Sequence, residues 1–343
     1  MSNTSLLALI RKKIVIDVDS MDPAVAIRHS SQTFTFCDMT SNQAIVFSEA
    51  SKPDRQAILT SACQGIKGSV LDIGQQVESA LVTLTALLAK EVFPHLTGKV
   101  HAQTSPKHAN NTEATIVEAK AIVNAFEGQG IPRSRVCIKI PATPESLIAC
   151  QYLEKTGINT LATCLFSLPQ AVAASQAGCQ YVAPYFNELR VHFEPKVWRE
   201  YENPAEEHPM SPIISSIVAS FKKLGTKTLV MPASIVTSQE AAVLASLSPD
   251  HLTLSANVLD QLTIDAEGTA LSTLIERNSS YSGTDTSNVG VNSFPDYLKD
   301  GGQALREALS ADQEASRKLA DALGIFSEME EKTRVLLRQE LTK

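Results

Sequence analysis

Eight short apolar runs, each followed by a stretch with helical spacing, constrain the fold of this chain more than any other feature. The runs lie at 13–18, 33–39, 99–104, 135–140, 158–164, 180–185, 227–234 and 251–256. Residues 113–130, for example, place apolar side chains at helical spacing and end in glycine, as helices often do. Eight strand–helix alternations predict one (β/α)8 barrel domain over residues 1–343. An open doubly wound or nine-stranded sheet would need an edge strand that we do not find.

Three segments lie outside this alternation. Residues 196–212 form a polar, proline-rich loop after the sixth run, and 277–302 are rich in Ser, Gly and Asn, which is typical of a long connection. Residues 303–343 have the pattern of charged amphipathic helices. We expect this C-terminal helical extension to pack on the barrel or on a partner subunit rather than to form a separate domain.

Charge and cysteine usage exclude several classes of function. The chain has 30 basic and 37 acidic side chains, a net charge of −7, and no basic stripe that could follow a phosphate backbone, so we expect no nucleic-acid partner. The apolar runs are too short to span a bilayer, and the first residues lack the apolar core of a signal peptide. Six scattered cysteines without a CxxC pair are typical of reduced thiols. These features predict a soluble, cytoplasmic protein.

The stretch VCIKIP (136–141) places a lysine inside an apolar strand. Successive side chains of a barrel strand alternate between the lumen and the surrounding helices. Val136, Ile138 and Ile140 suit the helix layer, which directs Lys139 into the lumen together with Cys137.

The same alternation directs polar side chains of the other strands inward. These inward residues are Asp17, Asp19, His101, Gln103, Thr163, Ala183, Tyr185, Ser234, Thr253 and Ser255. A polar lumen near the carboxyl ends of the strands is typical of a catalytic barrel.

A lysine in such a lumen has a specific chemical use. Burial lowers the pKa of an amine, and a neutral amine attacks a carbonyl carbon to give a Schiff base, which serves as an electron sink for the adjacent carbon–carbon bond. The alternative is that Lys139 forms a structural ion pair with Asp17. The histidines show no metal-ligand spacing, and the Asp17/Asp19 pair alone is too small a set for a metal. No GxGxxG or P-loop is present, so we expect neither a cofactor nor a metal.

Several fragments in order along residues 14 to about 265 resemble the transaldolase family. They are VIDVDSMD, CDMTSN, CIKIPATPESL, LEKTGINTLATCLFSLPQAVAASQAG and QYVAPYFNEL. The resemblance implies a circularly permuted (β/α)8 barrel with its Schiff-base lysine on the fourth strand, where Lys139 lies. It also implies transfer of a dihydroxyacetone unit between sugars, or the simple aldol reaction of the related fructose-6-phosphate aldolases. Family members are frequently homodimers.

The resemblance assigns roles to four further residues. Asp17 matches the first-strand aspartate that handles protons at a substrate hydroxyl, and Asn42 matches an asparagine that binds the donor's hydroxyl groups. Thr163 matches the threonine that helps hold the catalytic water. Ser234 matches the serine of the turn after the seventh strand, which reads ASI here instead of ASF.

Two departures resemble the fructose-6-phosphate aldolase branch. Gln103 replaces a glutamate on the third strand, and Ala183-Pro184-Tyr185 replaces the SPF of transaldolases. In that branch glutamine, threonine and tyrosine position the water, and a tyrosine hydroxyl can act as general acid–base beside an iminium. The alternative for Tyr185 is a core aromatic residue with a satisfied hydroxyl.

Two other departures concern phosphate. Glu188 and Val236 stand where the family has the arginines that bind the substrate's phosphate. Glu188 would repel a phosphate dianion, and Arg190 could substitute only if its loop shifted. We therefore expect a substrate other than the usual sugar phosphate, or a phosphate bound elsewhere. His101 could tune the amine or contact the substrate, but a lone histidine in a barrel is more often a packing residue.

Three hypotheses follow for function. The leading one is a class I aldolase or transaldolase-like enzyme acting on a small carbonyl or sugar-like substrate through Lys139. The second is a different Schiff-base reaction that forms carbon–carbon bonds in specialised metabolism. The third is a catalytically silent barrel, against which the polar lumen argues, because unused buried polar groups are costly.

Overall fold

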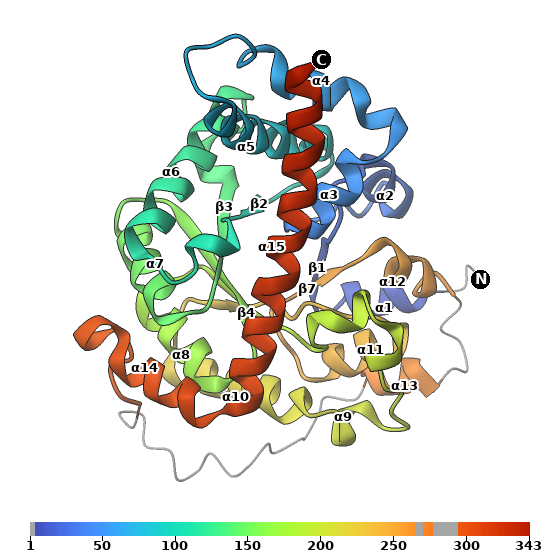
Figure 1. Ribbon diagram of the computed structural model, residues 1–343. Helices are drawn as coiled ribbons and strands as arrows, with labels where there is room; N and C mark the ends of the chain where they lie inside the picture. Colours follow the sequence, from blue (N-terminus) through green and yellow to red (C-terminus); the bar gives the residue numbers. More distant parts are fainter. Residues whose placement is uncertain (1–3, 265–269, 277–293) are drawn as a thin grey trace.

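Parallel strands close into a barrel at the centre of the computed structural model, which describes residues 4–264, 270–276 and 294–343 (Figure 1). Five strands are hydrogen-bonded in the order β2-β3-β4-β5-β6, and β1 pairs with β7. The backbone of Asp250 donates to Val230 O at 3.1 Å, which joins β6 to the segment that leads into β7. The predicted (β/α)8 barrel is thus confirmed.

The strands are β1 (Val15–Val18), β2 (Val100–Gln103), β3 (Val136–Pro141), β4 (Asn159–Leu165), β5 (Tyr181–Pro184), β6 (Leu229–Val230) and β7 (His251–Leu254). The helices up to β4 are α1 (Leu6–Arg11), α2 (Pro23–His29), α3 (Gln43–Ala50), α4 (Gln56–Gln64), α5 (Ile73–Val92), α6 (Thr112–Gly128) and α7 (Pro144–Lys155). The later helices are α8 (Leu168–Ala177), α9 (Pro204–Glu207), α10 (Met210–Leu224), α11 (Ser238–Ser246), α12 (Ala256–Gln261), α13 (Ala270–Glu276), α14 (Lys299–Ala311) and α15 (Gln313–Thr342).

The second expected strand, 33–39, is the main difference from the sequence prediction. This segment occupies the eighth position of the barrel through single bridges, from Met39 to Val18 on one side and to Val100 on the other, and from Phe36 to Leu96. Backbone hydrogen bonds also join it to both neighbours, such as Val18 N–H to Asp38 O at 3.0 Å and Met39 N–H to Lys99 O at 2.9 Å, so the segment completes the barrel although it forms no continuous ladder. The seventh expected strand, 227–234, is shorter than predicted, because only Leu229–Val230 forms a ladder.

Polar side chains start most of the helices that follow the strands. Asn42, Asn111, Thr143, Ser167 and Thr237 each accept a hydrogen bond from a backbone N–H in the first turn of α3, α6, α7, α8 and α11. Such caps satisfy amide groups that have no partner within the helix. Asn42, Thr143 and Ser167 come two or three residues after the carboxyl end of a barrel segment, so these three caps lie around the mouth of the lumen.

The C-terminal helix α15 crosses the barrel instead of extending the helical ring (Figure 1). It packs on α3, α4 and α5 and on the short helices η3 (Pro106–His108) and η5 (Leu189–His192), which follow β2 and β5. Within the expected extension at 303–343, α15 therefore lies over the loops at the carboxyl ends of the strands, whereas α14 packs on α7 and α8. The first part of the predicted connection 277–302, residues 277–293, lies outside the described residues.

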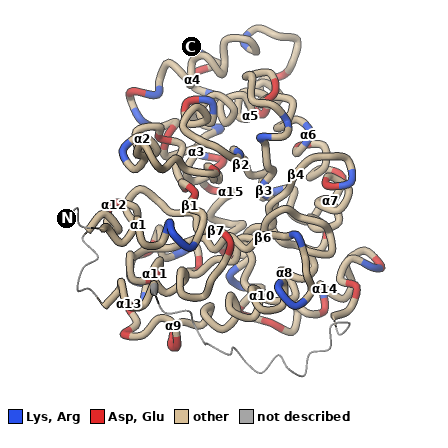
Figure 2. Tube along the Cα trace, turned by 180° about the vertical axis from the view of Figure 1, so that it is seen from behind, with Lys and Arg blue, Asp and Glu red and all other residues tan. Residues whose placement is uncertain are grey.

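Surface charge is mixed. Figure 2 shows Lys and Arg dispersed among Asp and Glu along the trace. In the described part of the chain, no helix has both the length and the apolar character needed to cross a membrane.

Gly98 lies where the turn before β2 meets the eighth barrel position. A Cβ atom there would overlap Asp38 Oδ1 and lie 2.7 Å from Cys37 Sγ. We expect Gly98→Ala to lower the free energy of unfolding by about 1–3 kcal/mol, because overpacking a closed site forces side chains and backbone apart. Chemical denaturation checks this, and an unchanged midpoint would contradict the tight packing.

Candidate active site

Lys139 extends from β3 into the barrel and is 2% exposed. Within the described residues its Nζ makes no ion pair and no hydrogen bond, and it lies 5.9 Å from the centre of the Tyr185 ring. Burial lowers the pKa of Lys139, and the negative charge of Asp19 opposes this only in part. The predicted structural ion pair with Asp17 is not formed. The neutral form of this amine is therefore easier to reach than that of a lysine in water.

A chamber of about 420 Å³ opens above Lys139 at the carboxyl ends of the strands. Among the described residues its charged lining consists of Asp19, Glu49 and Lys139, without an arginine. The other lining residues are Ser20, Asn42, Ala44, Ile45, Ser48, Tyr185, Leu189, His192, Phe193, Ala233, Ser234, Ser255, Ala256 and Asn257. The chamber is thus rich in hydroxyl and amide groups and poor in positive charge.

An irregularity in β4 brings two neighbouring residues toward Lys139. The pairing of β4 with β5 shifts between Ala162 and Leu165, and Cys164 in the shifted stretch has a positive φ of 51°. Such a bulge can redirect side chains. Thr163 Oγ1 lies 3.1 Å from the Tyr185 hydroxyl, and Cys164 also interacts with Tyr185 and Lys139. Burial raises the pKa of Tyr185 well above its usual value, so the hydroxyl keeps its proton.

Asp19, rather than Asp17, is the first-strand aspartate at the chamber. Its charge acts on Lys139, Tyr185 and His192, and Thr40 Oγ1 donates a hydrogen bond of 2.6 Å to it. The prediction for Asp17 is corrected here, because its carboxylate lies deeper in the lumen. There it accepts from the backbone N–H of Asp38 at 2.8 Å and contacts His251 Nδ1 at 2.8 Å.

A buried polar network fills the floor of the lumen below Lys139. His101 Nε2 contacts Asp38 Oδ2 at 2.8 Å, and the Tyr181 ring lies between His101 and His251. Burial raises the pKa of Asp17 to about 6 despite the opposing effect of His251. His101 is fully buried and does not line the chamber, so the structure does not support its predicted contact with substrate.

One group in this floor has ligand atoms close enough to hold a metal. One oxygen each of Asp17 and Asp38 and Cys37 Sγ lie within 4.8 Å of one another. Both carboxylates already accept protein hydrogen bonds, from the backbone of Asp38 and Lys99 and from the two histidines. This donor set therefore has protein partners rather than free ligand positions.

Gln103 is the register partner of Lys139 on the neighbouring strand, so the two side chains leave the sheet on the same face. Gln103 Nε2 donates to Gln43 Oε1 at 2.8 Å, while Gln103 Oε1 has no hydrogen-bond partner in the described residues. Asn42 Oδ1 caps α3 by accepting from Ala44 and Ile45, which leaves its amino group toward the chamber lining. Asn42 thus lines the chamber, whereas the predicted Gln103 lies outside the chamber lining and borders a smaller cavity that also contacts Asn42.

His192 is a chamber residue that sequence reasoning missed. Its Nε2 lies 2.8 Å from Ser234 Oγ, and Ser234 has a positive φ of 59°. Burial lowers the pKa of His192, with Asp19 opposing, so the imidazole is neutral near pH 7. The residue comes from η5, a loop helix without strand periodicity, so no pattern in the sequence indicated its direction. Ser234 lines the chamber as the alternation predicted.

Besides His101, three predicted substrate-binding residues lie outside the chamber lining. Glu188 pairs with Arg317 of α15 at 2.7 Å, and Val236 donates its backbone N–H to Glu240 at the start of α11. Ala183 is buried in β5. Arg190 pairs with Glu194 and does not replace a missing arginine, because it does not line the chamber either.

Comparison with known proteins agrees with this geometry. The family model "Transaldolase/Fructose-6-phosphate aldolase" matches residues 16–318. The chain belongs to this family. The transaldolase of Fusarium oxysporum f. sp. lycopersici is 32% identical over 226 residues, which cover 66% of this chain and 69% of the relative. The transaldolase of Saccharomyces cerevisiae is 30% identical over 267 residues, or 78% of this chain and 77% of the relative.

Among solved structures, 3-hexulose-6-phosphate synthase from Salmonella typhimurium aligns with 77% of this chain and 98% of its own, at 13% identity and a TM-score of 0.41. The family membership establishes a transaldolase-type enzyme. The lining of the chamber around Lys139 in the described residues contains no arginine.

Proposed function

We propose that this member of the transaldolase family makes or breaks a carbon–carbon bond through a Lys139 Schiff base with a small, unphosphorylated ketone or ketose. The observation that carries the proposal is the buried, unpaired amine of Lys139 beneath a chamber without arginine. A neutral amine is the reactive form, and a chamber bordered by two carboxylates disfavours a phosphate dianion.

The residues around Lys139 fit the steps of such a reaction. The amine attacks the ketone carbon, and loss of water gives an iminium. The hydroxyl of Tyr185, held by Thr163, lies where it can exchange a proton with that water. Asp19 is the carboxylate available to take a proton from a substrate hydroxyl when the neighbouring carbon–carbon bond breaks. Asn42 and Ser234 offer hydrogen bonds to further hydroxyl groups.

His192 supports the choice of an uncharged substrate. A neutral imidazole exchanges hydrogen bonds with hydroxyl groups but gives little attraction to a dianion. The nearby cations Lys52 and Arg55 are paired with Asp22 and Glu49, so their charge is already compensated.

Borohydride trapping tests the proposal. The protein is incubated with dihydroxyacetone, hydroxyacetone, fructose or fructose 6-phosphate, reduced, and measured by intact mass. Hydride addition to the iminium leaves a stable secondary amine, so a Schiff base appears as the mass of the donor minus one oxygen atom. We expect an adduct with an unphosphorylated donor. No adduct with any of these donors would contradict the proposed substrate class.

Phosphate should add no affinity. We expect the dissociation constants of dihydroxyacetone and dihydroxyacetone phosphate, and of fructose and fructose 6-phosphate, to differ by less than about threefold within each pair. A forked arginine contact contributes about 1.5–3 kcal/mol, or roughly tenfold or more in affinity, and the chamber lacks one. Isothermal titration calorimetry at two salt concentrations checks this. Tighter, salt-sensitive binding of the phosphate esters would contradict it.

A further inference from the structure

The amide of Gln43 is held in one orientation by its surroundings. Gln43 Nε2 lies 2.9 Å from Thr104 O, and 3.4 Å from both Gln103 O and Glu330 Oε2. Two of these groups are carbonyl oxygens and the third is a carboxylate oxygen, so all accept hydrogen bonds. Only the amino end of the Gln43 amide can face them. Its oxygen must therefore face the opposite way, toward Gln103.

This orientation fixes the next amide in turn. Gln43 Oε1 can only accept, so it requires the amino group of Gln103, which donates to it at 2.8 Å. Gln103 Oε1 is then left as a buried acceptor without a partner in the described residues. An unpaired buried acceptor is costly unless water or a ligand uses it.

A water-sized space adjoins these groups. A cavity of about 40 Å³ is lined by Gln103, Gln43 and Asn42 on one side and by residues of α5, α6 and α15 on the other. It is separate from the Lys139 chamber, with which it shares Asn42. This volume exceeds the space that one water molecule needs. The lining is polar enough to hold such a molecule beside Gln103.

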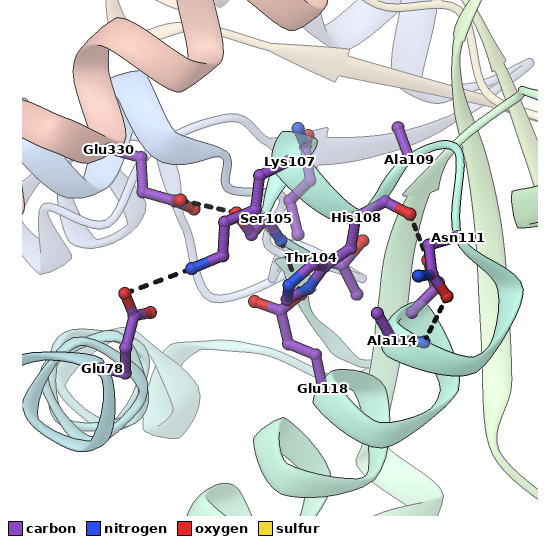
Figure 3. A network of polar contacts seen from close by, with 12 residues as sticks. Glu78, Thr104, Ser105, Lys107, His108, Ala109, Asn111, Ala114, Glu118 and Glu330 are labelled. Carbon is purple, nitrogen blue, oxygen red and sulfur yellow. Dashed lines mark hydrogen bonds and ion pairs between the residues drawn. The ribbon is translucent and has the colours of Figure 1, made fainter. Parts of the chain in front are cut away.

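The C-terminal helix α15 forms a hydrogen bond with the segment that follows Gln103. Ser105 Oγ donates to Glu330 Oε1 at 2.6 Å, and Glu330 is 4% exposed and paired with Arg334 (Figure 3). The neighbouring Ser105 N–H donates to Glu118 of α6, and Lys107 pairs with Glu78 of α5. Helices α5, α6 and α15 thus hold the segment that follows Gln103.

We propose that Gln43, supported by Glu330, is a positioning residue that presents Gln103 Oε1 as a hydrogen-bond acceptor for the water used at Lys139. The inference rests on the proposed Schiff-base function and adds the element that orients its water. Without Gln43, the side-chain amide of Gln103 can flip. The Gln103 amino group then occupies the position that the Gln103 oxygen holds when Gln43 is present.

A double-mutant cycle tests this role with dihydroxyacetone as the probe. Gln43→Met, Gln103→Met and the double variant are compared by the rate of borohydride-trapped adduct and by exchange of the donor's carbon-bound hydrogens in D2O. We expect Gln43→Met to slow both about tenfold, the effect of about one hydrogen bond. The double variant should be as slow as Gln103→Met alone, since Gln43 acts through Gln103. Independent, multiplicative losses would overturn the proposal.

A matched control separates positioning from loosening of the C-terminal helix. Glu340 on α15 accepts from Gln56 and Thr60 of α4, far from Gln103 in the hydrogen-bond network. Glu340→Gln should leave both rates unchanged. If Gln43→Met does not fold, Glu330→Gln replaces it in the test. We expect Glu330→Gln to lower both rates about threefold in the wild-type protein and to have no effect in the Gln103→Met variant.

A substrate-free measurement distinguishes failure of this inference from failure of the proposed function. In protein labelled with 15N-glutamine, one side-chain amide proton of Gln103 should be protected from solvent exchange, and Gln43→Met should remove that protection. Absence of protection in the wild type overturns the positioning role whether or not a donor binds. Protection without any trapped adduct would instead count against the Schiff-base proposal alone.

Discussion

Lys139→Met is expected to abolish the borohydride-trapped adduct and to lower turnover by at least about 10³-fold, because removal of a covalent nucleophile leaves only binding effects. The same substitution should stabilise the protein at neutral pH. Burial lowers the folded-state pKa of Lys139 below the 10.5 of the unfolded chain. Folding at neutral pH therefore carries an unfavourable contribution that methionine removes.

The pH dependence gives this prediction its sign. Below the folded-state pKa, Lys139 is protonated in both the folded and the unfolded chain, and its unfavourable contribution to the free energy of folding is at its maximum. As pH rises from there toward 10.5, the unfolded state binds more protons than the folded state, so wild-type stability rises. The gain in Tm of Lys139→Met, about 2–4 °C for each kcal/mol, should thus shrink toward pH 10.5. Calorimetric melts between pH 7 and pH 10 measure it.

A half-buried lysine outside the lumen provides the control. Lys120 lies on α6, where its ammonium contacts the Tyr152 side chain. Lys120→Met should keep the adduct, the turnover and the pH dependence of the wild type. If the adduct survived in Lys139→Met but disappeared in another lysine variant, that other lysine would be the nucleophile.

Asp19→Asn is expected to lower turnover by about 10²–10³-fold while leaving Schiff-base trapping intact. Asp19 is the carboxylate at the chamber that can accept a proton as the carbon–carbon bond breaks, and general-base groups contribute rate factors of this size. Because Asp19 is partly exposed, its loss should change the melting temperature little. Steady-state kinetics, single-turnover trapping and thermal melts together check the prediction.

Asp17→Asn should show the opposite pattern. Asp17 is fully buried against His251, and removing one partner of a buried pair costs about 3–5 kcal/mol. We expect a large fall in Tm and a much smaller loss of turnover for each folded molecule. If Asp17→Asn instead stopped catalysis without destabilising the fold, the assignment of roles to the two aspartates would be reversed.

The sequence predicted the barrel and the direction of its key lysine because strand alternation has a period of two residues. That period separates lumen from helix layer but does not give depth along the lumen. Asp17 and Asp19 both point into the lumen. The pairing of Asp17 with Thr253 places the Asp17 carboxylate beside His251 at the floor of the lumen. Only the register between strands far apart in sequence decides which aspartate reaches Lys139.

Other parts of the site had no local signal. His192 lies on a short loop helix, where no periodicity tells which way a side chain points. Glu330 is separated from Ser105 by 225 residues, and its contact depends on how α15 crosses the barrel. Residues 33–39 combine aromatic and β-branched side chains, which favour a strand. The segment does hydrogen-bond to both neighbours, but it forms single bridges instead of the continuous ladder that this composition predicts.

The parallel pairing of β1 with β7 has a consequence for biosynthesis. It joins residues 15–18 to 251–254, so a nascent chain must grow by more than 200 residues before β1 meets this partner. At usual synthesis rates of about 5–20 residues per second, that interval is roughly 10–50 s. Throughout it the edge of β1 that will pair with β7 offers unpaired backbone groups to other chains. The ribosome-bound chain therefore carries an open sheet edge until β7 has emerged.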